Sequence, residues 1–203
     1  VQYGRKEGCD LSKIEFETYR DKYRSTRSGP IVAGTPKAFT DAMDKITEWS
    51  SIEDPNCIFV LDSFTAFGKA AYEWAHSMNP TAKDKRQIFF AAQQACETTL
   101  ALLTGAEFRM NVIVISHVNY KEITEGVNKG YPMAIGSALG PHIPKYFNTL
   151  VLAESSGIGK NVRRMIKTMP TGVIDLKTPS PNIEYELPLE SGLATLFETL
   201  KGK

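Results

Sequence analysis

The sequence of 203 residues has few cysteines, no long apolar run and almost no net charge. Its three cysteines, Cys9, Cys57 and Cys96, lie far apart and form no CxxC pair, so the sequence indicates neither a zinc site nor a disulfide framework. No stretch of about 18 apolar residues is present, and the N-terminus lacks the layout of a signal peptide. A formal net charge of +1 means that any basic surface has to be local. We therefore expect a cytoplasmic protein with no membrane partner.

The composition that remains is that of an ordinary globular protein. Hydrophobic residues make up 42% and charged residues 23% of the chain, enough for one domain with a sizeable core. Apolar spacing predicts helices from about Pro36 to Ser50, with Thr35 as the cap, from about Lys85 to Gly105, and around Leu193 to Leu200. Residues 1–30 are polar, with only a partial helical stripe at Ile14, Phe16, Tyr19 and Tyr23.

Two apolar segments predict the centre of a sheet. Ile58–Leu61, in "CIFVLDSFTAFG", is apolar enough for a strand covered on both faces, and Val112–Ile115 is a second such run. A long helix between them makes a βαβ unit, whose parallel strands place Asp62 and His117 at one edge of the sheet. Ligands bind at that edge in open α/β sheets. Asp62 either holds Mg²⁺ on a nucleotide or caps the next helix.

The second half of the chain has a different character. Residues 119–145 contain many glycines and prolines and are expected to form a long functional loop. After them, "NTLVLAES", "VRRMIKTM" and "GVIDLK" alternate with "SGIGKN" and "PTG", which predicts antiparallel strands joined by tight turns. The expected fold class is therefore α/β, with a mostly parallel sheet flanked by helices and with C-terminal antiparallel β-hairpins.

The order of these features resembles the RecA-like ATPases. Within them it is most similar to the phage-encoded, single-domain nucleotide-binding proteins of single-strand annealing and recombination. The resemblance is carried by "VLDSFT", "VISHV", "IGSALGPHIPKYFNTLVL" and "RRMIKT", over about residues 30–180. It implies a single RecA-like domain over residues 1–203 that binds and hydrolyses ATP with Mg²⁺. It also implies action on single-stranded DNA, as a homo-oligomeric ring or filament, in the host cytoplasm if phage-encoded.

The resemblance assigns roles to residues by motif position. Asp62, followed by Ser63, corresponds to the Walker B acid that binds the metal and nucleotide, and His117 corresponds to the sensor on the neighbouring strand. Basic residues of a late hairpin reach the nucleotide of a neighbouring subunit in many members, and the candidates here are Arg163, Arg164 and Lys167. Two alternatives stay open: a structural histidine, and solvated charges that protect an edge strand from aggregation.

The loop after the sensor strand often faces DNA in this family. Its candidate DNA-binding residues combine positive charge with aromatic rings, which suits phosphate contacts and base stacking: Tyr120, Lys121, Lys129, Tyr131 and Lys145. Loop solubility explains the same lysines equally well.

The sequence departs from the family at the phosphate-binding loop. It contains no G-x-x-x-x-G-K-[ST] motif, whose backbone N–H groups cradle phosphates. "ESSGIGKN" has Glu154 in place of the first glycine and Asn161 in place of the hydroxyl, so we interpret it as a hairpin turn. The family order leads us to expect a strand and P-loop upstream of Val1. Glu7 and Glu15 lie in the region of the catalytic glutamate but match no motif.

Two hypotheses follow for the function. The first is an ATPase that acts on single-stranded DNA, and the second is a RecA-like binding or assembly scaffold that has lost hydrolysis, because fold alone does not decide activity. A helicase-loading or clock-type ATPase of the same fold also stays open. A G-x-x-x-x-G-K-[ST] motif in the reading frame upstream would favour the enzyme.

Overall fold

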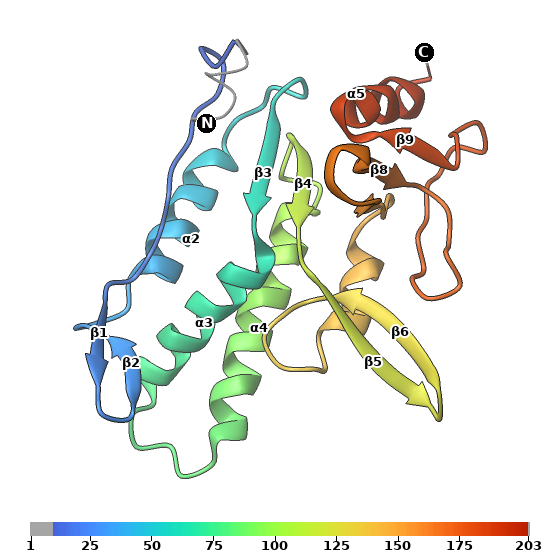
Figure 1. The fold of residues 1–203 in the computed structure, drawn as a ribbon. Coiled ribbons are helices and arrows are strands. Elements are labelled where there is room, and N and C mark those ends of the chain that lie inside the picture. The colour runs from blue at the N-terminus through green and yellow to red at the C-terminus, as the bar shows by residue number, and fades with distance from the viewer. Residues whose placement is uncertain (1–9, 203) are drawn as a thin grey trace.

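A computed structural model describes residues 10–202 as a mixed α/β protein (Figure 1). Its strands are β1 (Tyr23–Thr26), β2 (Gly29–Val32), β3 (Ile58–Asp62), β4 (Asn111–Ile115), β5 (Val118–Thr124), β6 (Val127–Pro132), β7 (Leu152–Ser156), β8 (Arg163–Lys167) and β9 (Glu186–Pro188). Its helices are α2 (Ala38–Trp49), α3 (Phe64–Met78), α4 (Lys85–Leu103), α5 (Leu189–Leu200) and the 3₁₀ helices η1 (Gly140–Tyr146) and η2 (Gly159–Asn161). Every described helix is too short or too polar to span a membrane.

Strands β3 and β4 form the expected parallel pair, with Asp62 opposite Ile115. Two helices connect them, however, and not one. Helix α4 was predicted, whereas α3 was missed, although its buried residues recur at helical spacing: Phe64, Phe67, Ala71 and Ala75. We call β3, β4, α2, α3 and α4 the main layer.

The main layer buries only one face of its sheet. Phe59 lies under the helices, where its ring meets those of Trp49 and Phe108 with centroids 5.7 and 5.5 Å apart. On the opposite face, Ile58 is 47% exposed and Val60 49% exposed, because no described element covers them. The expectation of a strand buried on both faces is therefore wrong.

The expectation of a mostly parallel sheet is also not met in residues 10–202. The β3–β4 pair is the one parallel pair of strands there, and the other sheets are small and antiparallel. The mixed α/β class holds, but the sheet is divided into separate pieces.

The expected loop at 119–145 begins as a β-hairpin. Strands β5 and β6 pair around Glu125 and Gly126, and Gly126 has φ +76°, which a glycine adopts without strain. Gly130 faces Ile174 so closely that an added Cβ would lie 2.7 Å from its Cγ1 atom. Of the glycines that suggested a loop, Gly126 is thus the turn residue of the hairpin, and Gly130 allows close packing against Ile174.

Residues 152–200 form what we call the C-terminal module, made of β7, β8, β9 and α5. The strands are antiparallel, and "SGIGKN" joins β7 to β8, as predicted. "GVIDLK" forms only isolated bridges, at Ile174 and Lys177. The module has its own small core, made of Ile166, Ile183, Leu187 and Leu196.

Residues 14–22 are extended and form no helix, so the expected helical stripe at residues 14–23 is wrong. This segment runs beside α2 and enters the β1–β2 hairpin (Figure 1). Thr35 does not cap α2 either. The cap comes from Asp21, whose Oδ1 accepts hydrogen bonds from the backbone N–H groups of Lys37 (2.7 Å) and Ala38 (3.1 Å).

Candidate functional site

Asp62 is the last residue of β3, and its side chain is exposed at the carboxyl edge of the parallel pair. The peptide bond to Ser63 is cis. Ser63 is the residue that caps α3, since its Oγ accepts a hydrogen bond from the N–H of Ala66 at 3.3 Å. The capping alternative for Asp62 is therefore wrong, and no hydrogen bond or ion pair within residues 10–202 engages its carboxylate.

A junction of hydroxyl groups lies beside Asp62. Thr65 Oγ1 and Ser116 Oγ are 3.3 Å apart, and both donate to the carbonyl of Met133, at 3.1 and 2.9 Å. Thr65 belongs to the first turn of α3, Ser116 follows β4, and Met133 follows β6. The junction joins the sheet edge to the base of the β5–β6 hairpin. This connection between hydroxyl groups was not predicted from the sequence.

His117 belongs to the same junction through its backbone. Its N–H donates to Thr65 Oγ1 (3.2 Å), and its carbonyl accepts from the N–H of Met133 (2.7 Å). The residue is exposed, and none of the described residues forms a hydrogen bond or ion pair with its imidazole. Asp62 and His117 thus lie at one edge of the sheet, as their strand positions led us to expect. Their chemical roles stay predictions.

The edge offers a single carboxylate to a metal. No group of three or more His, Cys, Asp or Glu side chains within residues 10–202 is arranged to hold a metal ion. Mg²⁺ bound to a nucleotide needs less, because phosphate oxygens and water supply most of its ligands and the protein adds one or two carboxylates. Asp62 fits such a Mg²⁺ and does not fit a metal held by protein alone.

The three lysines predicted to contact DNA already have partners within the chain. Lys121 donates to the carbonyl of Ser137 (2.6 Å), Lys129 pairs with Asp175 (2.6 Å), and Lys145 pairs with Glu97 (2.7 Å). The hydrogen bond from Asp175 raises the pKa of Lys129, and Glu97 does the same to the pKa of Lys145. A phosphate would have to compete with these groups for the lysines.

The two tyrosines of this region lie on opposite faces of the hairpin. Tyr120 is paired with Gly130 and is exposed, whereas Tyr131 is paired with Asn119 and is half-buried. Tyr120 therefore offers a free ring face and Tyr131 a restricted one.

The basic residues predicted to act on a neighbouring subunit lie on β8, in the C-terminal module. Arg163 and Arg164 are exposed and form no hydrogen bond or ion pair with other described residues. Lys167 pairs with Glu154 at 2.6 Å and with Glu186 at 3.8 Å, and the bond to Glu154 raises its pKa. The structure does not bring this group together with Asp62.

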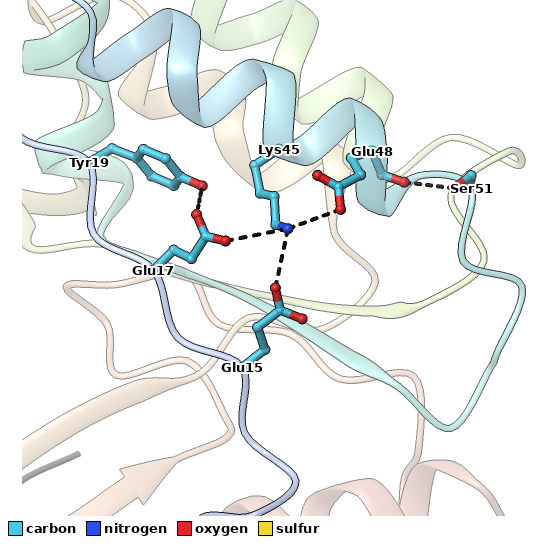
Figure 2. Close-up of polar contacts among 6 residues, drawn as sticks. All are labelled: Glu15, Glu17, Tyr19, Lys45, Glu48 and Ser51. Carbon is cyan, nitrogen blue, oxygen red and sulfur yellow. Dashed lines mark hydrogen bonds and ion pairs between the residues drawn. The ribbon is translucent and has the colours of Figure 1, made fainter.

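A charge cluster that the sequence did not reveal holds the N-terminal segment on α2 (Figure 2). Lys45 Nζ lies 3.2 Å from Glu15, 3.3 Å from Glu17 and 3.0 Å from Glu48, and Glu17 also accepts a hydrogen bond from Tyr19. Burial and Glu17 raise the pKa of Tyr19 to about 12, while Tyr19 lowers the pKa of Glu17. Glu15 is thus an ion-pair residue here, and Glu7 lies outside the described residues.

The chain matches a known protein family. A family model described as an AAA domain matches residues 14–180, which is most of the chain and includes β3, β4 and the hydroxyl junction. Neither the curated proteins nor the solved structures contain a significant match.

Proposed function

The chain belongs to the AAA-domain family, within the superfamily of P-loop NTPases, and from this premise we propose that it binds and hydrolyses ATP with Mg²⁺. The finer proposal, which rests on the RecA-like resemblance, is that it acts on single-stranded DNA in recombination or single-strand annealing as a homo-oligomer. The observation that carries the nucleotide site is the exposed, unpaired carboxylate of Asp62 at the carboxyl end of a parallel strand pair.

In this proposal Asp62 orients the Mg²⁺ of the nucleotide, and Ser63 holds the first turn of α3 in place behind it. Mg²⁺ held by Asp62 would neutralise negative charge that develops on the phosphates. The imidazole of His117 is free to hydrogen-bond to the terminal phosphate. Cradling the phosphates needs further donors, since the sequence has no G-x-x-x-x-G-K-[ST] motif.

The hydroxyl junction supplies a route from the nucleotide to the β5–β6 hairpin. A shift of His117 displaces Met133, because the two residues share a backbone hydrogen bond and both also bond to Thr65. Met133 directly follows β6, so the hairpin moves with it. Nucleotide state thereby changes how the hairpin is presented to a partner.

The β8 arginines complete the site between subunits. In a ring or filament, Arg163 and Arg164 of one subunit reach the nucleotide of the next, where they stabilise negative charge. Lys167 would first have to leave Glu154, so we assign this role to the two arginines rather than to the lysine.

The test uses Mn²⁺–ATP with ¹⁵N-labelled 203-residue protein, because paramagnetic broadening in NMR spectra marks the metal site even when binding is weak. We expect the amide signals of Ser63, Thr65, Ser116 and His117 to broaden in the presence of Mn²⁺–ATP. Asp62→Asn keeps the shape of the side chain but removes its charge, and should abolish the broadening.

Asp44→Asn is the matched control, since Asp44 is an exposed aspartate on α2 with no partner among the described residues. It should broaden as the wild type does. Unchanged broadening in Asp62→Asn would remove Asp62 from the metal site. No broadening near β3 and β4 in the wild type would favour the non-hydrolysing scaffold.

A further inference from the structure

The extended residues 14–24, which we call the strap, alternate between two sides. Side chains at odd positions face the body of the protein: Glu15 and Glu17 pair with Lys45, and Tyr19 donates to Glu17. Figure 2 shows these three side chains pointing from the strap toward α2. A period of two is the geometry of an extended chain, in which successive side chains point to opposite sides.

The same alternation continues to the end of the strap. Asp21 accepts from the N–H groups that begin α2, and the Lys69 ammonium lies 5.0 Å from the centre of the Tyr23 ring. The strap is therefore anchored to both α2 and α3. Its odd positions are used for anchoring, so its even positions are held outward in a fixed row.

The outward row is unpaired and positively charged. Its members are all exposed: Ile14, Phe16, Thr18, Arg20, Lys22 and Arg24. The side chains of Arg20, Lys22 and Arg24, and of Arg27 in the following turn, form no hydrogen bond or ion pair within residues 10–202. They differ in this from Lys121, Lys129 and Lys145, which have partners in the chain.

The acids near the strap face the body of the protein and not the outward row. Asp21 is the only acid between Arg20 and Arg27, and one of its oxygens is bonded to the start of α2. Glu15 and Glu17 face Lys45 on the other side. A chain with a formal net charge of +1 therefore carries three unpaired cations in the outward row and a fourth, Arg27, in the turn that follows.

We propose that the outward row of the strap is a binding surface for single-stranded DNA. The choice of polymer rests on the proposed function. Three features of the row suit single-stranded DNA. First, its cations stand at alternate positions, about 6.5 Å apart along an extended chain, and can follow a linear row of phosphates. Arginine suits phosphate because its planar fork donates two parallel hydrogen bonds. At the other end of the row, Phe16 is 66% exposed and offers a ring on which a base can stack.

The first test compares two triple variants of the 203-residue protein by fluorescence anisotropy with labelled oligothymidylate at several salt concentrations. Arg20→Ala, Lys22→Ala and Arg24→Ala together should weaken binding at least about tenfold and reduce the slope of log K against log[salt] by about two. The control removes three exposed lysines elsewhere: Lys83→Ala, Lys85→Ala and Lys177→Ala. It should bind nearly as the wild type does.

The second test separates stacking from charge. Phe16→Ala should weaken binding about fivefold or more without changing the salt slope, because stacking releases no counterions. The neighbouring outward residue gives the control, and Ile14→Ala should have little effect. Circular dichroism melts of all variants should match the wild type, since the substituted side chains are exposed and form no hydrogen bond or ion pair within residues 10–202.

Equal losses in the strap and control variants, or no binding of oligothymidylate by the wild type, would overturn the proposal. So would equally tight, strap-dependent binding to phosphatidylserine vesicles or to an acidic peptide. The outcome is independent of the nucleotide site: Mn²⁺–ATP broadening near Asp62 without strap-dependent DNA binding refutes the strap alone. Strap-dependent DNA binding without that broadening refutes the nucleotide site alone.

Discussion

In the main layer three helices cover one face of two parallel strands, whereas in the C-terminal module one helix packs on two strands, β8 and β9, of a three-stranded antiparallel sheet. The main core contains interlocking rings, such as Phe39 and Phe67 with centroids 5.1 Å apart, and the module's core is a handful of aliphatic residues. The residues proposed for catalysis are divided between the two. Asp62 lies on the larger core and Arg164 on the smaller one, so we expect the metal site to be rigid and the arginine to be adaptable.

The largest expected effect is in the main layer. Phe64→Ala should lower the free energy of unfolding by about 3–5 kcal/mol, because Phe64 is 0% exposed and packs against Phe67 directly behind the candidate site. Urea denaturation followed by tryptophan fluorescence measures it, since Trp49 and Trp74 both belong to this layer. Phe64→Leu, which leaves a smaller cavity, should cost clearly less. Equal losses of the free energy of unfolding in the two variants would contradict the cavity explanation.

The next effect probes whether the module opens by itself. Leu196→Ala should cost about 2–4 kcal/mol, because it removes the contact of α5 with the small core. Hydrogen exchange should then speed up in β8 and β9 while β3 and β4 keep their protection. Exchange that rises equally in all four strands would mean that the two cores unfold as one unit, and the distinction between them would fail.

Two helical glycines, one in each region, allow the two cores to be compared through smaller changes in stability. An added Cβ at Gly192 in α5 would lie 2.8 Å from Leu187 Cβ, and one at Gly68 in α3 would lie 3.1 Å from the Ile135 nitrogen. Alanine also gains about 1 kcal/mol of helix propensity, which offsets part of the strain. We expect Gly192→Ala to destabilise by about 1–2 kcal/mol and Gly68→Ala by less than about 1 kcal/mol. Thermal melts of the pair would test the order, and the reverse order would contradict it.

The last effect is a pH dependence that arises in the main layer and is small near neutral pH. Burial raises the pKa of the Cys96 thiol to about 12 from its ordinary value of 9.0, so folding favours the protonated form. Its contribution is full below pH 9 and is lost as the pH rises toward 12, by about 1 kcal/mol at pH 10. Urea midpoints measured from pH 8 to 11 should fall less steeply in Cys96→Ala, which has no thiol to ionise. Parallel pH profiles in the two proteins would contradict the prediction.

The sequence predicted those parts of the fold whose signals are local. Helix α4 and strands β3 and β4 were found because their apolar patterns are continuous, and the position of Asp62 followed from strand order. Helix α3 was missed because Ser63 was interpreted, together with Asp62, as part of the nucleotide site, although Ser63 is an ordinary N-cap. The β5–β6 hairpin was not predicted because its glycines were interpreted as signs of a loop. The Glu125–Gly126 pair between alternating segments was the signal available.

Other parts of the site could not be predicted from sequence because their partners are distant along the chain. Nothing in the neighbourhood of Lys129 or Lys145 indicates that Asp175 and Glu97 engage them. The same holds for the strap. The inward direction of its odd-numbered side chains could not be predicted, because their partners, Lys45 and the start of α2, are distant in sequence.

Because Asp21 of the strap caps α2, the first turn of this helix shows whether the strap is docked on the protein. The capping carboxylate lies 16 residues before the N–H group of Lys37 that it accepts from, so the first turn of α2 is complete only while the strap is docked. A polymer that clamps the strap against the protein slows exchange of the Lys37 and Ala38 amide protons with solvent. A polymer that lifts the strap away accelerates their exchange, and these two protons thereby distinguish binding on the docked strap from binding that peels it off.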